Sequence, residues 1–190
     1  MRPVYTYINN LLSKEECERI IEIQSHKLET STVFSEVSKT DNIYNKIRKN
    51  LIRKTKVSWI SPGSEFDPII QRILDAVKYV AYTEHDMLEI GNTENVQFAE
   101  YGFLSHYSKH LDVGIKGSHR VISTTVQLTD PNKYIGGKLI LELENENKIP
   151  PQTQGTVVIF PSIIPHKVTP ILYGKRHSLA LWTHLNNINK

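Results

Sequence analysis

The chain has 190 residues, of which 39% are hydrophobic and 23% charged, as in ordinary soluble globular proteins. Its formal net charge of +3 is too small to indicate a nucleic-acid-binding protein, and no apolar run approaches the roughly 18 residues that span a membrane. The single cysteine, Cys17, excludes an internal disulfide, and the N-terminal residues lack the apolar core of a secretory signal. We therefore expect one cytoplasmic domain over residues 1–190, without a membrane anchor.

The first predicted element is a helix that begins after Ser13. Ser13 and Glu16 have the spacing of a capping box, in which each side chain accepts a hydrogen bond from the other residue's backbone amide. Apolar residues at helical spacing then predict a buried face, comprising Leu12, Cys17, Ile20 and Ile21, extended by Gln24. A second helix is predicted from Asp67–Pro68, because aspartate caps helices and proline is tolerated in the first turn. Its apolar face comprises Ile69, Ile70, Ile73, Val77 and Val80.

Between these helices, residues 46–56 carry six basic side chains and no acidic one: Lys46, Arg48, Lys49, Arg53, Lys54 and Lys56. Such a run is most simply a solvated loop or edge. A mobile basic flap that recruits an acidic substrate or partner is the alternative. Composition alone does not separate these two interpretations.

From about residue 95 the sequence favours strands. The segments rich in β-branched and aromatic residues are 95–101, 120–128, 138–144, 155–160 and 177–185. Turn residues such as Asp130-Pro131 and Gly136-Gly137 separate them. We expect an all-β sandwich or barrel with the two helices against one face. A helical and basic part (1–90) and a β core (95–183) would then form one domain.

Residues 106–112 (HYSKHLD) contain two candidate metal motifs. His106 and His110 have the spacing of a helical zinc protease, but such proteins have glutamate where this chain has Tyr107. Glycines shortly afterwards also make a helix unfavourable. We therefore predict a strand, in which His110 and Asp112 point to the same face. A His-x-Asp pair alone is weak evidence, so the site requires a third ligand.

A third ligand and an anion anchor occur downstream. His166 follows a strand and a proline turn, and Arg176 lies ten residues later, across a hairpin that Tyr173-Gly174 favours. Two histidines and one carboxylate, with an open face opposite, suit the non-haem Fe(II) of oxygenases, whereas zinc more often takes a further His or Cys. A nearby guanidinium can bind a carboxylate bidentately, as a dicarboxylate co-substrate such as 2-oxoglutarate requires.

Four stretches resemble one family: VQFAEY, Tyr107-x-x-His110-x-Asp112, Arg120 with STTVQLTDPNKYIGGKL, and FPSIIPHKVTPILYGKRHSLALW. From about residue 95 to 183 the chain is similar to Fe(II)- and 2-oxoglutarate-dependent dioxygenases of the prolyl 4-hydroxylase type, especially their bacterial and phage PKHD-type hydroxylase branch. RKTKVSWI extends the similarity to about residue 50. The resemblance implies a mainly β fold with a double-stranded β-helix core, jelly-roll or cupin-like, buttressed by N-terminal α-helices.

The resemblance also implies roles for individual residues. The iron ligands and catalytic centre would be His110, Asp112 and His166. Arg176 would pair with the distal carboxylate of 2-oxoglutarate, while Tyr101 would hydrogen-bond the co-substrate or line its pocket. Trp182 would lie near the site on the strand of Arg176. Gln127 departs from the animal enzymes, which have a tyrosine there that contacts 2-oxoglutarate, but its amide could still donate a hydrogen bond.

The implied reaction hydroxylates a C–H bond, most simply of a prolyl residue in a peptide or protein, and releases succinate and CO2. It would use Fe(II), 2-oxoglutarate and O2, with ascorbate as reductant. One alternative is a hydroxylase of a free amino acid or another small molecule, and a second is a silent cupin-like module that only binds a metal or ligand. We interpret the remaining candidates as polar or packing residues: His106, His119, His177 and His184.

Overall fold

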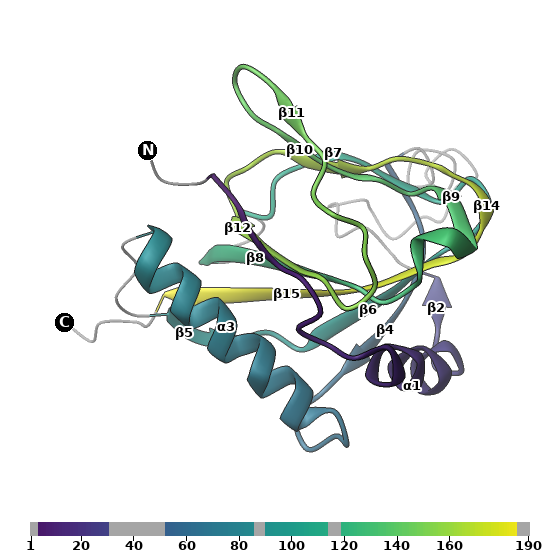
Figure 1. Ribbon diagram of the computed structural model, residues 1–190, viewed down its shortest axis with the longest axis horizontal. Coiled ribbons are helices and arrows are strands. Elements are labelled where there is room, and N and C mark those ends of the chain that lie inside the picture. Colours follow the sequence, from purple (N-terminus) through teal and green to yellow (C-terminus); the bar gives the residue numbers. More distant parts are fainter. Residues whose placement is uncertain (1–3, 31–51, 86–89, 114–118, 186–190) are drawn as a thin grey trace, which may run out of the picture.

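The computed structural model describes residues 4–30, 52–85, 90–113 and 119–185 (Figure 1). Residues 31–51, which include part of the basic segment 46–56, lie outside the described part, so its interpretation as a loop or as a flap is not tested there. The described helices are α1 (Lys14–Ser25), α3 (Asp67–His85) and a short 3-10 helix, η1 (Pro131–Lys133). The strands are β1 (Thr6–Ile8), β2 (Glu29–Thr30), β3 (Arg53–Lys54), β4 (Lys56–Ile60), β5 (Ile90–Thr93), β6 (Val96–Tyr101), β7 (His106–His110), β8 (Arg120–Gln127), β9 (Tyr134–Gly136), β10 (Leu139–Glu142), β11 (Asn147–Lys148), β12 (Val157–Pro161), β13 (His166–Val168), β14 (Ile171–Gly174) and β15 (Arg176–Leu185).

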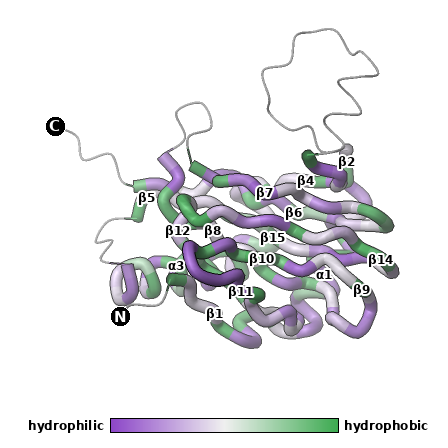
Figure 2. The backbone as a smooth tube through the Cα atoms, turned by 90° about the horizontal axis from the view of Figure 1, so that it is seen from above, coloured by the Kyte–Doolittle hydropathy of each residue, from purple (hydrophilic) through white to green (hydrophobic). Residues whose placement is uncertain are grey.

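Two antiparallel sheets face each other. The larger sheet has the order β1-β12-β8-β15-β6-β4-β2, with β5 also paired to β15, and the smaller has the order β11-β10-β13-β7-β3. All five strand-like segments of the sequence form strands here, so the prediction of a mainly β fold is confirmed. Hydrophilic and hydrophobic residues alternate along many of these strands, as the tube in Figure 2 shows. This period-2 pattern separates an inner face, towards the other sheet, from an outer face.

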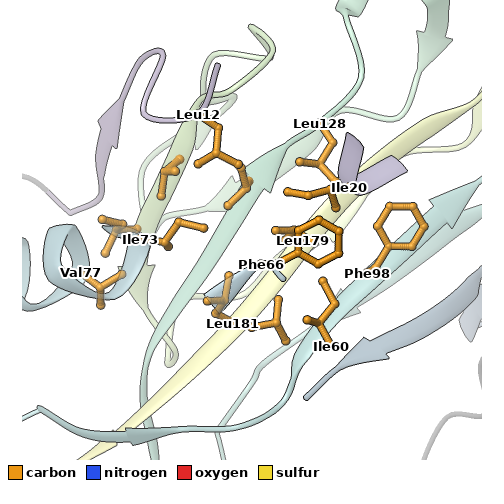
Figure 3. Packing of buried hydrophobic residues seen from close by; sticks show 14 of the residues in the cluster. Leu12, Ile20, Ile60, Phe66, Ile73, Val77, Phe98, Leu128, Leu179 and Leu181 are labelled. Carbon is orange, nitrogen blue, oxygen red and sulfur yellow. The ribbon is translucent and has the colours of Figure 1, made fainter. Parts of the chain in front are cut away.

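Helices α1 and α3 lie on the outer face of the larger sheet, opposite the smaller sheet (Figure 1). Their buried residues join the outward residues of the sheet in one cluster, part of which Figure 3 shows. A second cluster fills one part of the space between the sheets; its members include Tyr101, Leu141, Phe160 and Ile171. No helix in the described ranges is long and apolar enough to cross a membrane.

The starts of α1 and α3 agree with the prediction, but the capping role predicted for Asp67 does not. Ser13 caps α1, and both hydrogen bonds of the capping box with Glu16 are present, at 2.8 and 3.2 Å. Asp67 is instead the first residue of α3, and its carboxylate accepts hydrogen bonds from the amides of Gly63 and Ser64. The side chain thus stabilises the preceding turn rather than the free amides of its own helix.

The hairpin predicted at Tyr173-Gly174 is wrong. Both residues belong to β14, which pairs with β9 in a separate two-stranded sheet, with Gly174 opposite Tyr134. The chain then enters the larger sheet at Arg176 without a reversal between paired strands. The glycine fits this crossing because its φ is +72° and an added Cβ would meet the carbonyl oxygen of Lys133.

The layer of helix on sheet generates a stability prediction. Ile73 is fully buried in the cluster beneath α3, so replacing it with alanine removes apolar contacts and leaves a cavity. We expect Ile73→Ala to lower the free energy of unfolding by about 2–5 kcal/mol in urea titrations. Tyr79→Ala on the same helix is the control, since Tyr79 is 69% exposed and its loss should change the free energy by less than about 0.5 kcal/mol. Equal effects would contradict this packing.

Candidate active site

His110 and His166 face each other across two paired strands of the smaller sheet. His110 ends β7, His166 begins β13, and the two residues are direct partners in the antiparallel register. Each ring uses Nδ1 for a backbone carbonyl, Ser108 O at 2.8 Å for His110 and Ile164 O at 2.9 Å for His166. Because a carbonyl only accepts, each Nδ1 carries a hydrogen, which leaves Nε2 as the ring nitrogen that can offer a lone pair to a metal.

Asp112 completes the group from a turn, not from the strand that the sequence predicted. The strand ends at His110, and the amide of Asp112 donates to the carbonyl of Ser162 at 3.2 Å. Carboxylate oxygens of Asp112 lie 3.7 Å from His110 Nε2 and 3.4 Å from His166 Nε2. The three ligand atoms all lie within 4.8 Å of one another. Ligands at about 2.1 Å and right angles around one ion would be about 3 Å apart, so small adjustments complete the site.

Ser123, which the sequence analysis did not single out, orients the carboxylate. Its hydroxyl donates to Asp112 Oδ2 at 2.7 Å and lies 2.8 Å from the hydroxyl of Ser162. Since Ser123 has one hydroxyl hydrogen, Ser162 must donate to it, which gives a chain of two hydrogen bonds ending on the carboxylate. The sequence does contain a signal for this residue. Ser123, Thr125 and Gln127 alternate along β8, so their side chains lie on the same face of the strand.

The electrostatics favour the metal-binding protonation states. Burial, helped by the neighbouring His166, lowers the pKa of His110 to about 4, so its imidazole is neutral near pH 7. Burial alone would raise the pKa of the Asp112 carboxyl, but its contact with His166 and the hydrogen bond from Ser123 outweigh it and hold that pKa well below its usual range. The neutral His110 imidazole, the His166 imidazole and the Asp112 carboxylate together form a ligand set that suits Fe(II).

Arg176 lines the same cavity as the three ligands. The cavity also contacts the side chains of Tyr101 and Trp182, whereas Gln127 is not among its lining residues. Arg176 is 2% exposed, and Gln127 Oε1 accepts from its Nε at 3.1 Å and its Nη2 at 2.8 Å. Its Nη1 is buried without a hydrogen-bond partner, and among the described residues no carboxylate lies within ion-pair distance. A buried cation lacking a counter-charge fits the distal carboxylate of a 2-oxo dicarboxylic acid.

Arg53 is a further cavity residue that the sequence analysis did not assign to the site. It lies on β3, where its guanidinium donates to Thr55 Oγ1 at 2.8 Å and to Gln97 Oε1 at 2.7 Å. The guanidinium also lies over the ring of Tyr107, 4.6 Å from its centroid, and that ring stacks on His110. Among the described basic residues of segment 46–56, Arg53 is the one that lines the cavity. The pairing of β3 with β7 places it there, and composition does not reveal this pairing.

The other histidines lie apart from the ligand group. His106 is at the opposite end of β7, where Nδ1 lies 3.1 Å from the carbonyl of Leu104. His177 lies near Thr129 and Glu100, and His184 near Glu94. His110, Asp112 and His166 form the metal-binding group found among the described residues. The strand conformation of residues 106–110 also rules out the helical zinc motif.

Comparisons with known proteins agree with this geometry. Residues 96–184 match the model of the 2OG-Fe(II) oxygenase superfamily. A PKHD-type hydroxylase of Prochlorococcus marinus is 28% identical over 176 residues, covering 92% of this chain and 75% of that relative. Another, from Gloeothece citriformis, is 32% identical over 88 residues, covering 45% of this chain and 40% of that relative.

Solved structures show the same fold. A Pseudomonas putida prolyl 4-hydroxylase superimposes with a TM-score of 0.73 at 20% identity, covering 97% of this chain and 94% of that one. A Trichoplax adhaerens prolyl hydroxylase, solved with a peptide fragment of the hypoxia inducible factor oxygen degradation domain, gives 0.71 at 20% identity, covering 95% and 83%. The double-stranded β-helix and the site define the class, a 2-oxoglutarate-dependent dioxygenase. The match to the 2OG-Fe(II) oxygenase superfamily covers residues 96–184, and these residues include the three ligands and Arg176.

The contact between Ser123 and Asp112 generates a metal-binding prediction. Ser123→Ala removes the hydroxyl that orients the carboxylate, so the affinity for Fe(II), measured by anaerobic titration, should fall about 10-fold. Ser178→Ala is the matched control, because Ser178 lines the same cavity from β15 without a hydrogen bond to Asp112. Unchanged affinity in Ser123→Ala, or equal losses in both variants, would contradict the orienting role.

Proposed function

We propose that this protein uses Fe(II), 2-oxoglutarate and O2 to hydroxylate a prolyl residue of a peptide or protein. The observation that carries the proposal is one cavity holding three convergent ligand atoms and a buried guanidinium with an unpaired N–H group. Iron bound there would supply oxidative decarboxylation of the 2-oxo acid to succinate and CO2 and transfer of one oxygen atom to a C–H bond. The named activity of the PKHD-type relatives and of the prolyl hydroxylase neighbours supports this choice of reaction.

The chain's own residues would divide the work along the cavity. His110, Asp112 and His166 hold the metal, and Arg176 holds the distal carboxylate of 2-oxoglutarate. Tyr101 lies beside Arg176, whose guanidinium carbon is 5.3 Å from the ring centroid, so its ring shields this end from water. Trp182 lines the cavity, and the guanidinium carbon of Arg120 lies 4.1 Å from the centroid of its ring. Arg120 also donates hydrogen bonds to both carboxylate oxygens of Glu94, each at 2.6 Å. We expect this restrained wall to pack against the substrate.

A peptide substrate is favoured over a free amino acid because a solved relative of the same fold was captured with a peptide fragment. We propose ascorbate as the reductant that maintains Fe(II), and a cytoplasmic location in keeping with the single buried Cys17. The alternative of a silent metal-binding module predicts metal binding without turnover. The assay described next separates these possibilities.

The first test is turnover on proline peptides. Wild-type protein with Fe(II), 2-oxoglutarate, ascorbate and O2 should form succinate and add one oxygen atom to a peptide, as mass spectrometry detects. His110→Ala removes a metal ligand and should lower the rate at least about 100-fold. His106→Ala, at the other end of the same strand, should keep the rate within about 3-fold. Succinate formation with free amino acids but with no peptide would favour the small-molecule alternative, and metal binding without succinate would favour the silent module.

The second test concerns charge recognition by Arg53. Its guanidinium lines the cavity, so a carboxylate on the substrate near the target residue would be attracted there. Arg53→Ala should raise the KM for an acidic proline peptide about 10-fold and leave that for a neutral peptide nearly unchanged. The preference for the acidic peptide should weaken as salt rises. Lys56→Ala is the control, because Lys56 belongs to the same basic segment but is exposed at the start of β4. It should leave both KM values nearly unchanged. Equal KM values for both peptides in wild-type protein would support the solvated-loop interpretation.

A further inference from the structure

Both hydrogen bonds that Arg176 donates go to one residue, Gln127. Its Nε and Nη2 groups form one edge of the planar guanidinium, and both donate to the single oxygen Oε1 of Gln127. This edge is one of the two with which arginine binds a carboxylate bidentately, the other being Nη1–Nη2. The Nε–Nη2 edge is therefore occupied before any ligand arrives. Nη1 is buried and makes no hydrogen bond, and the Tyr134 hydroxyl lies close to the guanidinium.

Gln127 lies behind the arginine as seen from the cavity. The cavity is lined by Arg176 but not by Gln127. The backbone of Gln127 is fixed by its amide, which donates to Thr156 O at 2.9 Å, and by its carbonyl, which accepts from Gly155 N at 2.8 Å. The direct partner of Gln127 in the pairing of β8 with β15 is Ser178, which lies two residues after Arg176. A side chain anchored in this way holds the guanidinium plane in one orientation.

The opposite side of Arg176 is also closely packed. The ring of Tyr101 lies beneath the guanidinium, and Gly137 packs against the methylene stem. A Cβ at position 137 would lie 3.0 Å from Arg176 Cδ and would meet Cδ1 of Ile171. Gly137 also has a φ of +61°, a conformation that other residues adopt at a cost. The stem therefore has little room to swing, and the hydrogen bonds that the guanidinium donates to Gln127 select its rotation.

We propose that Gln127 is a positioning residue that makes Arg176 present its Nη1 side, rather than its Nε–Nη2 edge, to the distal carboxylate of the 2-oxo acid. This inference rests on the proposed function of the same cavity. Gln127 acts through Arg176 and does not itself touch the co-substrate. Its removal frees the Nε–Nη2 edge and allows the guanidinium to rotate, so the carboxylate loses a pre-oriented partner.

The test measures co-substrate affinity in the Mn(II)-loaded protein by calorimetry, which needs no turnover. Gln127→Leu keeps the side-chain size and removes the acceptor, and we expect it to weaken 2-oxoglutarate binding about 10-fold. The affinity for Mn(II) should stay within about 2-fold, because the metal ligands are untouched. Gln154→Leu is the matched control, since Gln154 donates a hydrogen bond to Leu128 O at 2.8 Å, outside the cavity. It should leave both affinities unchanged.

Two further comparisons separate positioning from a merely structural role. The first uses 2-oxopentanoate, which has the chelating end of 2-oxoglutarate without the distal carboxylate. Its affinity should be the same for wild-type protein and Gln127→Leu. The second compares the double variant Gln127→Leu/Arg176→Gln with Arg176→Gln alone. Here Gln127→Leu should weaken 2-oxoglutarate binding by less than about 2-fold, because Arg176, through which Gln127 acts, is gone. The ratio of the affinities for 2-oxoglutarate and 2-oxopentanoate, measured on one protein sample, does not depend on the folded fraction of that sample.

The outcomes are distinguishable. Wild-type protein that binds Mn(II) but not 2-oxoglutarate overturns the proposed function together with this inference. Wild-type protein that binds 2-oxoglutarate overturns the inference alone if Gln127→Leu binds it equally well. The inference also fails if Gln127→Leu weakens both 2-oxo acids by the same factor, or if its effect persists without Arg176. A loss confined to the dicarboxylate and dependent on Arg176 supports it.

Discussion

The site depends on the pairing of β7 with β13, because this register places His110 directly opposite His166. Side chains at partner positions of an antiparallel pair are held a few ångströms apart by the backbone alone. The two Nδ1–carbonyl bonds then fix the tautomers, so the ligand atoms are set before an ion arrives. Asp112 reaches this pair only because the turn after β7 is tied to Ser162, which follows a strand of the larger sheet. The ligand group therefore depends on both sheets: the smaller sheet carries the two histidines, and a contact with the larger sheet places Asp112.

The cavity exists because the larger sheet carries small side chains on part of its inner face. The positions that line it from β6, β8 and β15 include Ala99, Ser123, Thr125, Ser178 and Ala180. The outer face of the same strands carries large apolar residues such as Phe98, Val126 and Leu179, which pack under the helices. One alternating pattern therefore stabilises the sheet on one side and leaves space on the other. Burial under α1 and α3 makes the wall rigid, as precise placement of ligands requires.

Much of this was predictable from the sequence, for definite reasons. Local rules predicted α1 through its capping box and the strands through alternation, and ligand chemistry predicted that His110, Asp112 and His166 would converge. Long-range pairing was not predictable: Tyr173 and Gly174 pair with β9, almost 40 residues earlier, and so form no hairpin with β15. Ser123 and Arg53 enter the site through partners 11 and 44 residues away, which local patterns do not encode. The contact of Gln127 with Arg176 spans 49 residues and was not foreseen either.

Arg176 shows how the site balances stability against binding. A guanidinium at 2% exposure, held by a neutral amide, has lost most of its hydration without gaining a counter-charge among the described residues. Such burial destabilises the folded state, since an unpaired buried charge is costly. The same charge creates a strong, weakly screened attraction for an anion entering the cavity. Binding of a dicarboxylate there would therefore stabilise the fold as well as complete the site, because a ligand that binds only the native state adds to its stability. Gln127 makes this arrangement tolerable by satisfying two of the N–H groups, while its neutrality leaves the charge for the ligand.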